Sequence, residues 1–288
     1  MRDYVIFTES ACDIPTGTLR EWDVGWCSLT YTFEGESRQY ENYELSCPEF
    51  YERVRQGGVA RTSAVNASAF EEAFAKIVSE GKDILYVGFS TGLSGTCDAA
   101  GIAAKDVMEA HPEADIRCVD TRGASAGFGL LLYMAVEKKK AGATLAENEQ
   151  YILDNRFHLC HWFTVEDLIY LKRGGRISAA TAIVGNVLGF KPVMHMDDAG
   201  HLINMFKVRG RNASLRAMAD KYGELALDKK DGTIFISHGD CLEDAEKLGK
   251  MLHERYGATV DRIVYVGPVI GAHTGPGVLA LFFLGKQR

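Results

Sequence analysis

The sequence predicts an α/β fold with two domains, the first on a parallel doubly wound sheet and the second on a mixed sheet with helices. Three observations support this prediction. The length of 288 residues suits two domains of ordinary size. Short apolar segments alternate with helical patterns in the first half, as in a parallel sheet with helices on both faces. In the second half, two strand patterns flank Asp197-Asp198-Ala199-Gly200, a typical hairpin turn, which makes the second sheet mixed.

In the first half, each apolar strand pattern is followed by a loop and a helix. The expected strands are Tyr4–Thr8, Ile84–Phe89 and Ile116–Val119. The expected helices begin near Ser68, where Ser68 and Glu71 fit a capping box, after the Gly-rich segment 90–96, and at Ser125. Ligands of parallel sheets bind beyond the carboxyl ends of the strands. The loops at Ser10, Ser94 and Thr121 should therefore gather at one edge.

The second half begins near residue 158, which gives expected domains of 1–158 and 159–288. Its expected strands are 158–164, 191–196, 201–208, 233–237, 262–266 and 278–284. Its expected helices are 167–188, around a Gly174-Gly175 break, 213–227 and 242–256. Residues 267–277 are rich in Gly and Pro and are expected to form a loop.

Composition excludes several classes of protein. The net charge of -7 argues against a general nucleic-acid binder. No apolar run reaches the roughly 18 residues of a membrane span, and the first residues lack the pattern of a signal peptide. Seven scattered cysteines without a C-x-x-C motif indicate reduced thiols and a cytoplasmic protein. His158, Cys160 and His161 lack a second ligand cluster, so no metal site is expected.

The segment Gly88-Phe89-Ser90-Thr91-Gly92-Leu93-Ser94-Gly95-Thr96 is the most informative motif. It combines hydroxyls and glycines directly before a helix, where free backbone N–H groups favour an anion. It matches neither the phosphate-binding P-loop nor the G-x-S-x-G nucleophile elbow. An uncharged site rich in hydroxyls suits a carboxylate better than a triphosphate with its metal.

Three further segments have both a structural and a functional interpretation. Arg61-Thr62-Ser63-Ala64 precedes a helix, where hydroxyl side chains are usually caps and turn formers. The cations around Gly174-Gly175 form either a solvated helix end or a basic patch for an anionic ligand or acidic partner. His273, among glycines, is either an ordinary surface residue or a hydrogen-bond donor to a carboxylate.

These segments, in this order, resemble the DegV family, whose members include the fatty-acid-binding subunits of bacterial fatty acid kinases. The resemblance spans almost the whole chain. The matching stretches are Glu9–Pro15 (ESACDIP), Thr62–Ser68 (TSAVNAS), Phe89–Thr96 (FSTGLSGT), Val119–Gly127 (VDTRGASAG), Asp167–Ser178 (DLIYLKRGGRIS), Lys191–Val193 (KPV), Lys207–Gly210 (KVRG) and Gly271–Gly277 (GAHTGPG).

The resemblance implies two α/β domains with a lipid in the cleft between them. It also implies which residues contact the fatty acid carboxylate, namely Thr62 and Ser63 of the T-S motif, Ser94 and Gly95 of the G-L-S-G-T motif, and His273 and Thr274 of the H-T-G-P-G loop. Arg176 of the G-G-R motif and the nearby Arg173 are implied to engage the kinase. The chain departs from the family at Thr8-Glu9-Ser10-Ala11-Cys12-Asp13 and lacks the Gln and Pro of the T-S-Q-P-S motif.

The expected function is that of a carrier. The protein would bury a long acyl chain and present its carboxylate to a partner kinase for acyl-phosphate formation, with no cofactor and no catalytic residue of its own. It would have no integral membrane segment and at most transient membrane contact. Two alternatives stay open: a serine hydrolase or acyltransferase using Ser94 and His273, and a protein that binds a phosphorylated small molecule.

Overall fold

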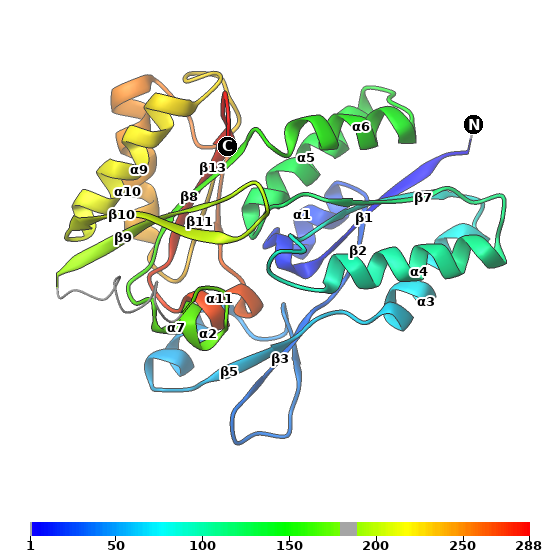
Figure 1. Ribbon diagram of the computed structural model, residues 1–288, viewed down its shortest axis with the longest axis horizontal. Coiled ribbons are helices and arrows are strands. Elements are labelled where there is room, and N and C mark those ends of the chain that lie inside the picture. The colour runs from blue at the N-terminus through cyan, green and yellow to red at the C-terminus, as the bar shows by residue number, and fades with distance from the viewer. Residues whose placement is uncertain (1, 179–188) are drawn as a thin grey trace.

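The computed structural model describes residues 2–178 and 189–288 (Figure 1). Its first sheet is parallel throughout, in the order β2-β1-β6-β7. The strands are β1 (Tyr4–Glu9), β2 (Val24–Cys27), β6 (Asp83–Gly88) and β7 (Ile116–Asp120). Every residue of β6 is buried, because a parallel sheet covered on both faces leaves its central strands no solvated side. The predicted parallel sheet is thereby confirmed, and β2 joins it at one edge.

Helices cover both faces of this sheet, as expected. One face carries α3 (Ala67–Ser79) and α4 (Thr96–Ala110), and the other carries α5 (Ala126–Lys140) and α6 (Leu145–Asn155) (Figure 1). The short helices η1 (Ser10–Cys12) and α1 (Thr16–Glu21) follow β1. The predicted capping box at Ser68 is wrong. The N-cap of α3 is Asn66, whose side chain accepts a hydrogen bond from the Ala69 amide at 2.9 Å.

A second sheet of six strands is mixed, in the order β10-β9-β8-β13-β11-β12. Its strands are β8 (Leu159–Thr164), β9 (Phe190–Met196), β10 (Leu202–Arg209), β11 (Phe235–His238), β12 (Arg262–Tyr265) and β13 (Leu279–Leu284). The hairpin of β9 and β10 is antiparallel, as predicted, while β11 and β12 are parallel. Helices α9 (Arg211–Leu225) and α10 (Leu242–Tyr256) pack on its outer face.

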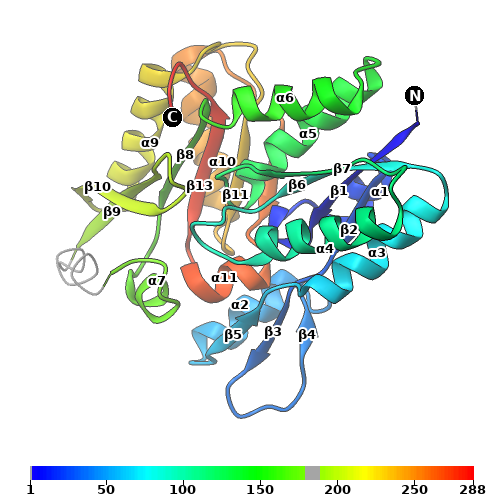
Figure 2. The same cartoon turned by 45° about the vertical axis from the view of Figure 1, so that its right-hand side comes forward.

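A small third sheet, β4-β3-β5, was not predicted. It consists of β3 (Thr30–Phe33), β4 (Tyr40–Glu41) and β5 (Ala60–Ser63), and it extends away from the parallel sheet in Figure 2. Thr62 therefore lies on a strand, not in the turn expected from its hydroxyl neighbours. The helix α2 (Cys47–Arg55) connects β4 to β5.

Two expected elements of the second half differ in the structure. Residues 268–274, expected to be a loop, form the helix α11 (Pro268–Thr274), which packs against α2, α7, β3 and β5. Within the described part of the predicted helix 167–188, α7 spans only Ile169–Arg173. The remainder of that prediction, residues 179–188, lies outside the described residues.

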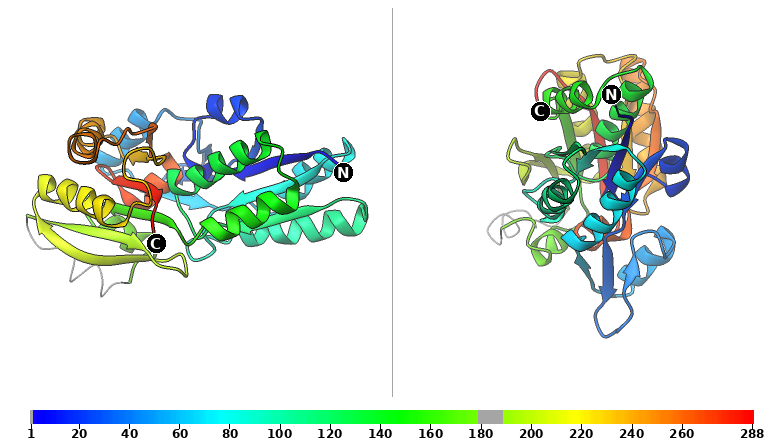
Figure 3. Two further views of the ribbon diagram at one scale, coloured as in Figure 1. Left: turned by 90° about the horizontal axis from the view of Figure 1, so that it is seen from above. Right: turned by 90° about the vertical axis from the view of Figure 1, so that its right-hand side faces the viewer.

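The helix α5 connects the two large sheets. It contacts β1 and β6 of the parallel sheet and β8, β11 and β13 of the mixed sheet. Its sequence is apolar on nearly every side, and Phe128, Leu130, Leu131 and Leu132 are fully buried. Figure 3 shows the two sheets on either side of this helix. The two halves therefore share one hydrophobic core along α5.

Candidate functional site

A cavity of about 210 Å³ lies where the loops of the parallel sheet face the mixed sheet and α11. This volume greatly exceeds the roughly 10–15 Å³ that suffices for one water, so the cavity is more than a packing defect. Most of its wall is apolar. The apolar side chains include Leu29, Phe89, Leu93, Phe163, Leu171, Met196, Leu202, Val269, Ile270, Val278 and Phe282. The cavity therefore suits a long apolar ligand.

Strand periodicity explains part of this wall. Successive side chains of a strand point to opposite faces, so alternate residues share one face. His161 and Phe163 of β8 face the cavity in this way, and so do Ala280 and Phe282 of β13. The register pairs Ala280 with Phe163 and Phe282 with His161, so these four side chains form one continuous patch.

Thr62 and His273 form a hydrogen-bonded pair on the cavity wall. Thr62 Oγ1 lies 2.8 Å from His273 Nε2, although the two residues are 211 positions apart. The pairing of β5 with β3 fixes Thr62, and the packing of α11 on β3 and β5 brings His273 to it. Because side chains alternate along β5, the neighbouring Ser63 is exposed and does not line the cavity.

His273 occupies an apolar and electropositive environment. Burial, and then the nearby Arg176, lower the pKa of His273 to about 4, so the ring is neutral at pH 7. Its Nδ1 is buried and has no hydrogen-bond partner among the described residues. The backbone of Gly174 lies against this nitrogen, and a Cβ at Gly174 would be 2.1 Å from Nδ1. Residue 174 must therefore be glycine for the imidazole to keep this position.

Ser94 lies at the start of α4, in the glycine-rich loop. Its Oγ is 2.9 Å from Thr96 Oγ1 and accepts a hydrogen bond from the Thr96 amide at 3.3 Å. Gly95 occupies the N-cap position of this helix of 15 residues. The first amides of a helix lack partners within the helix and carry its positive dipole end, so this corner of the cavity favours an anion.

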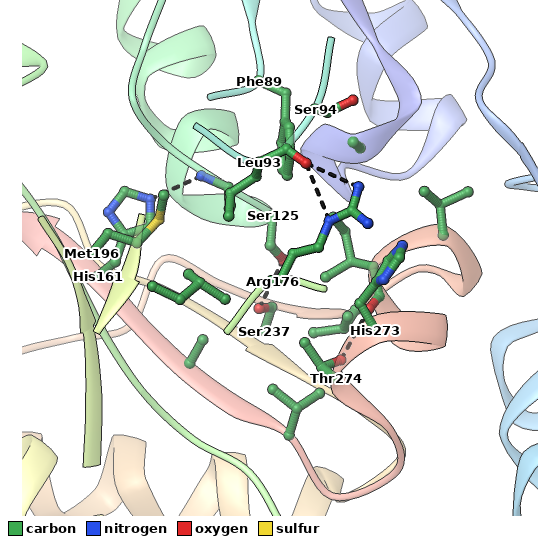
Figure 4. Close-up of a pocket in the computed structure, with 18 of the residues that line it drawn as sticks. Phe89, Leu93, Ser94, Ser125, His161, Arg176, Met196, Ser237, His273 and Thr274 are labelled. Atoms are coloured by element: carbon green, nitrogen blue, oxygen red, sulfur yellow. Dashed lines mark hydrogen bonds between the residues drawn. The ribbon is translucent and has the colours of Figure 1, made fainter. Parts of the chain in front are cut away.

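Arg176 joins the glycine pair of residues 174–175 to the Ser94 loop. It donates to the Leu93 carbonyl through Nε at 3.1 Å and Nη2 at 2.9 Å (Figure 4). It also donates to the Gly174 carbonyl through Nη1 at 2.5 Å. Burial lowers the pKa of the Arg176 guanidinium. These three hydrogen bonds to backbone oxygens fix the guanidinium beside the cavity wall.

The structure brings most of the predicted site residues together. Those that line the cavity are Thr62, Ser94, Gly95, Arg176, His273 and Thr274. The hydroxyl of Thr274 donates to the Ile270 carbonyl at 3.1 Å, a bond within α11. Arg173 lies outside the cavity, is exposed, and has its guanidinium 5.6 Å from the centre of the Tyr170 ring.

The geometry does not form the nucleophile–base pair that a serine hydrolase needs. Ser94 is hydrogen-bonded to Thr96, whereas His273 is hydrogen-bonded to Thr62. The base of such a pair lies within hydrogen-bond reach of its serine and is oriented by a third group. His273 Nδ1 has no such orienting partner in the described chain.

Sequence reasoning missed three polar residues of the wall: Ser125, His161 and Ser237. His161 was considered only as a metal ligand. Its Nε2 accepts a hydrogen bond from the Ala124 amide at 3.1 Å. Ser125 lies within the stretch 119–127 that resembles the family motif, and this resemblance could have indicated a role for Ser125 in the site. Ser237 is the penultimate residue of β11 and carried no sequence signal.

Neither a metal-binding cluster nor a membrane-spanning helix occurs in the described residues. In residues 2–178 and 189–288, no three His, Cys, Asp or Glu side chains are grouped so that they could hold a metal ion. The helices in the same two ranges include none with the length and apolar character needed to cross a bilayer.

Comparison with known proteins gives consistent matches along the whole chain. The family model described as "Uncharacterised protein, DegV family" matches residues 3–286. A DegV domain-containing protein from Clostridium perfringens is 42% identical over 100% of this chain and 99% of its own. One from Streptococcus pyogenes is 32% identical over 99% of both chains.

Solved structures match equally well. A stearic-acid-binding protein from Eubacterium ventriosum is 25% identical, with a TM-score of 0.89 over 98% of both chains. A fatty-acid-binding DegV family protein from Thermus thermophilus is 26% identical, with a TM-score of 0.88 over 99% of this chain and 100% of its own. The predicted α/β architecture, with one parallel and one mixed sheet, is thereby confirmed.

Proposed function

This chain belongs to the DegV family, and from that premise we propose that it binds a long-chain fatty acid and presents the carboxylate to a partner kinase. The observation that carries the proposal is a single cavity with an apolar wall and a polar group of Thr62, Ser94 and His273. The structural relatives from Eubacterium ventriosum and Thermus thermophilus bind stearic acid and fatty acid, respectively.

The acyl tail would supply most of the affinity. Burial of each CH₂ group contributes about 0.8 kcal/mol, so a chain of some fifteen carbons contributes roughly 10 kcal/mol before the entropic cost of binding is subtracted. The side chains of Phe163, Met196, Leu202 and Phe282 would contact this tail. The polar group would then determine which end of the fatty acid points toward it.

The carboxylate would be held by uncharged donors. The Ser94 hydroxyl and the Gly95 amide can each donate one hydrogen bond. The Thr62 hydroxyl can donate a third when the neutral imidazole of His273 donates to Thr62 through Nε2. Arg176 already donates to Leu93 and Gly174, so it would not grip both carboxylate oxygens as a fork. One oxygen would stay available to accept a phosphoryl group from the ATP of the partner.

Arg173 and Arg176 would contact the kinase. Arg173 is exposed and Arg176 is half-buried at the cavity wall, so an acidic kinase surface that met Arg173 would also approach the carboxylate. The cysteines are all unpaired, which supports a cytoplasmic location. In this proposal the chain supplies the bound substrate, and the kinase supplies the nucleotide, the metal and the catalytic groups.

Native mass spectrometry of the purified, unsupplemented protein tests the lipid proposal, followed by solvent extraction of any bound molecule. We expect a fatty acid in near-stoichiometric amount. An apo mass that stays unchanged after addition of oleate or palmitate would overturn the proposal. The second half of the proposal is tested by adding a bacterial fatty acid kinase and ATP to the loaded protein, where acyl phosphate should form only when both proteins are present.

A further inference from the structure

A chain of buried polar groups reaches the cavity wall away from Thr62 and His273. The Ser125 hydroxyl donates to Asp13 Oδ2 at 2.5 Å, and its Oγ lies 3.1 Å from Ser237 Oγ. Relative exposures are 4% for Asp13, 5% for Ser125 and 0% for Ser237. Both serines line the cavity, whereas Asp13 lies behind them. Three polar side chains thus meet inside a wall that is otherwise mostly apolar.

The conformation of Ser125 shows that its hydroxyl has a role other than helix capping. Ser125 is the N-cap residue of α5, yet its side chain makes no capping hydrogen bond. Its backbone, with φ 53° and ψ -150°, lies in a region that almost only glycine occupies. Backbone strain of this kind concentrates at functional sites. The hydroxyl instead connects Asp13 to Ser237.

Ser237 is the last member, on the cavity side, of the hydrogen-bonded series Asp13–Ser125–Ser237. When Ser125 donates its proton to Asp13, Ser237 donates to Ser125, and both lone pairs of Ser237 Oγ are left without a donor. Within residues 2–178 and 189–288, Ser237 Oγ makes no other side-chain hydrogen bond. A buried hydroxyl with unused capacity facing an apolar tail is unfavourable, because its lost hydration is not replaced.

We propose that this site selects long-chain fatty acids that carry a hydroxyl group on an interior carbon. This inference rests on the fatty-acid-binding function proposed above. The ligand hydroxyl would hydrogen-bond Ser237 Oγ. A hydroxyl both donates and accepts, so it matches Ser237 whichever way the protons of the Asp13–Ser125–Ser237 chain are arranged.

The position of the serines indicates an interior carbon. In Figure 4, Ser125 and Ser237 lie between His273 on one side of the cavity and His161 and Met196 on the other. With the carboxylate at Thr62, Ser94 and His273, the tail would pass the two serines on its way toward Met196. The hydroxyl would therefore be separated from the carboxylate by several methylene groups.

The test compares the affinity of the delipidated protein for stearic acid with its affinity for a positional series of hydroxystearic acids. We expect at least one hydroxy isomer to bind more tightly than stearic acid. In Ser237→Ala, the affinity ratio of that isomer to stearic acid should fall roughly three- to tenfold. Ser125→Gly suits the positive φ and should lower the same ratio without backbone strain. Ser79→Ala, at the exposed end of α3, is the matched control and should leave the ratio unchanged.

The outcomes distinguish failure of the proposed hydroxyl site from failure of the proposed fatty-acid-binding function. If the wild-type protein does not bind stearic acid, the proposed function fails. If it binds stearic acid but binds no hydroxy isomer more tightly than stearic acid, the proposed hydroxyl site is wrong. An unchanged ratio in both folded serine variants would mean that the polar chain holds ordered water only, and it would overturn the inference equally.

Discussion

The Thr62–His273 hydrogen bond orients the Thr62 hydroxyl at the proposed carboxylate site. Replacing Thr62 with Val keeps the shape of the side chain and removes the hydroxyl. We expect acyl-phosphate formation with the kinase to fall about tenfold, because one hydrogen bond contributes roughly 1 kcal/mol and its loss also frees the imidazole. Lipid retention should change much less, since burial of the tail dominates affinity. The coupled kinase assay and native mass spectrometry measure the two effects.

Thr32→Val is the matched control for this experiment. Thr32 lies on β3, in the same small sheet, and does not line the cavity. Its variant should form acyl phosphate at the wild-type rate. Near-complete loss of lipid in Thr62→Val would contradict the division between tail affinity and carboxylate positioning.

Glu9 should make stability depend on pH. It is fully buried at the end of β1 and accepts hydrogen bonds from the Tyr86 hydroxyl and, at 2.7 Å, from the Phe89 amide. Burial raises the pKa of Glu9 from 4.5 to about 7. Between these values the folded state holds a proton that the unfolded state releases. The free energy of unfolding should therefore decrease, by roughly 3 kcal/mol, as the pH rises from 4.5 to 7.

Glu9→Gln tests this dependence, because the amide cannot ionise and still accepts from Phe89. Burial also raises the pKa of Asp13 to about 7, so Asp13 adds a decrease in the same direction. The variant should keep the Asp13 contribution and lose that of Glu9. Urea unfolding at pH 5 and pH 8 should show a smaller difference in the variant. An equal difference in both proteins would exclude an ionising Glu9.

At the level of helices and strands, the sequence predicted the repetitive elements and missed those that depend on distant contacts. The bounds of α10 matched the prediction, since its apolar residues repeat at helical spacing and Gly257 ends it in a left-handed conformation. The helix α11 was predicted as a loop because of its glycines. Gly271 is instead required by close packing, as a Cβ there would be 2.7 Å from Tyr51 Oη.

The turn of the β9–β10 hairpin is held against the loops of the parallel sheet, and we expect it to control ligand release. The Ser90 hydroxyl donates to the Gly200 carbonyl at 2.9 Å, and Arg122 Nη1 donates to the Ala199 carbonyl at 3.0 Å. Met196 and Leu202, on either side of this turn, line the cavity. Ser90→Ala should increase the dissociation rate of a bound fatty acid severalfold, because it removes the bond to the Gly200 carbonyl and the bond that Ser90 Oγ accepts from the Gly92 amide.

Two measurements check this prediction. Stopped-flow transfer of the fatty acid to vesicles gives the dissociation rate, and amide exchange over 190–209 reports opening of the hairpin. Both should increase together in Ser90→Ala and stay at wild-type values in Ser79→Ala, whose residue is exposed on α3. Faster exchange with an unchanged dissociation rate would show that the ligand leaves by another route.

For the whole molecule, the sequence predicted which segments come together around the cavity. It did not predict all the side chains that form the cavity wall. Ser94, His273 and Arg176 were all selected from motifs, and they converge on one cavity. The polar chain of Asp13, Ser125 and Ser237 was missed. Its two serines are 112 residues apart, and their contact depends on how α5 packs between the sheets. No local pattern encodes such a contact.

The shared core has a consequence for the expected domains 1–158 and 159–288. Because α5 buries its surface against both large sheets, the core around it belongs to both halves, so we expect the protein to unfold in one cooperative transition. The second half has a further core between its sheet and α9 and α10, which this transition should include. Leu131→Ala, in the middle of α5, should lower the free energy of unfolding by about 2–5 kcal/mol. Amide protection should fall equally in β6 and in β13. Two separate transitions, with loss of protection confined to β6, would instead show that the halves fold as independent domains.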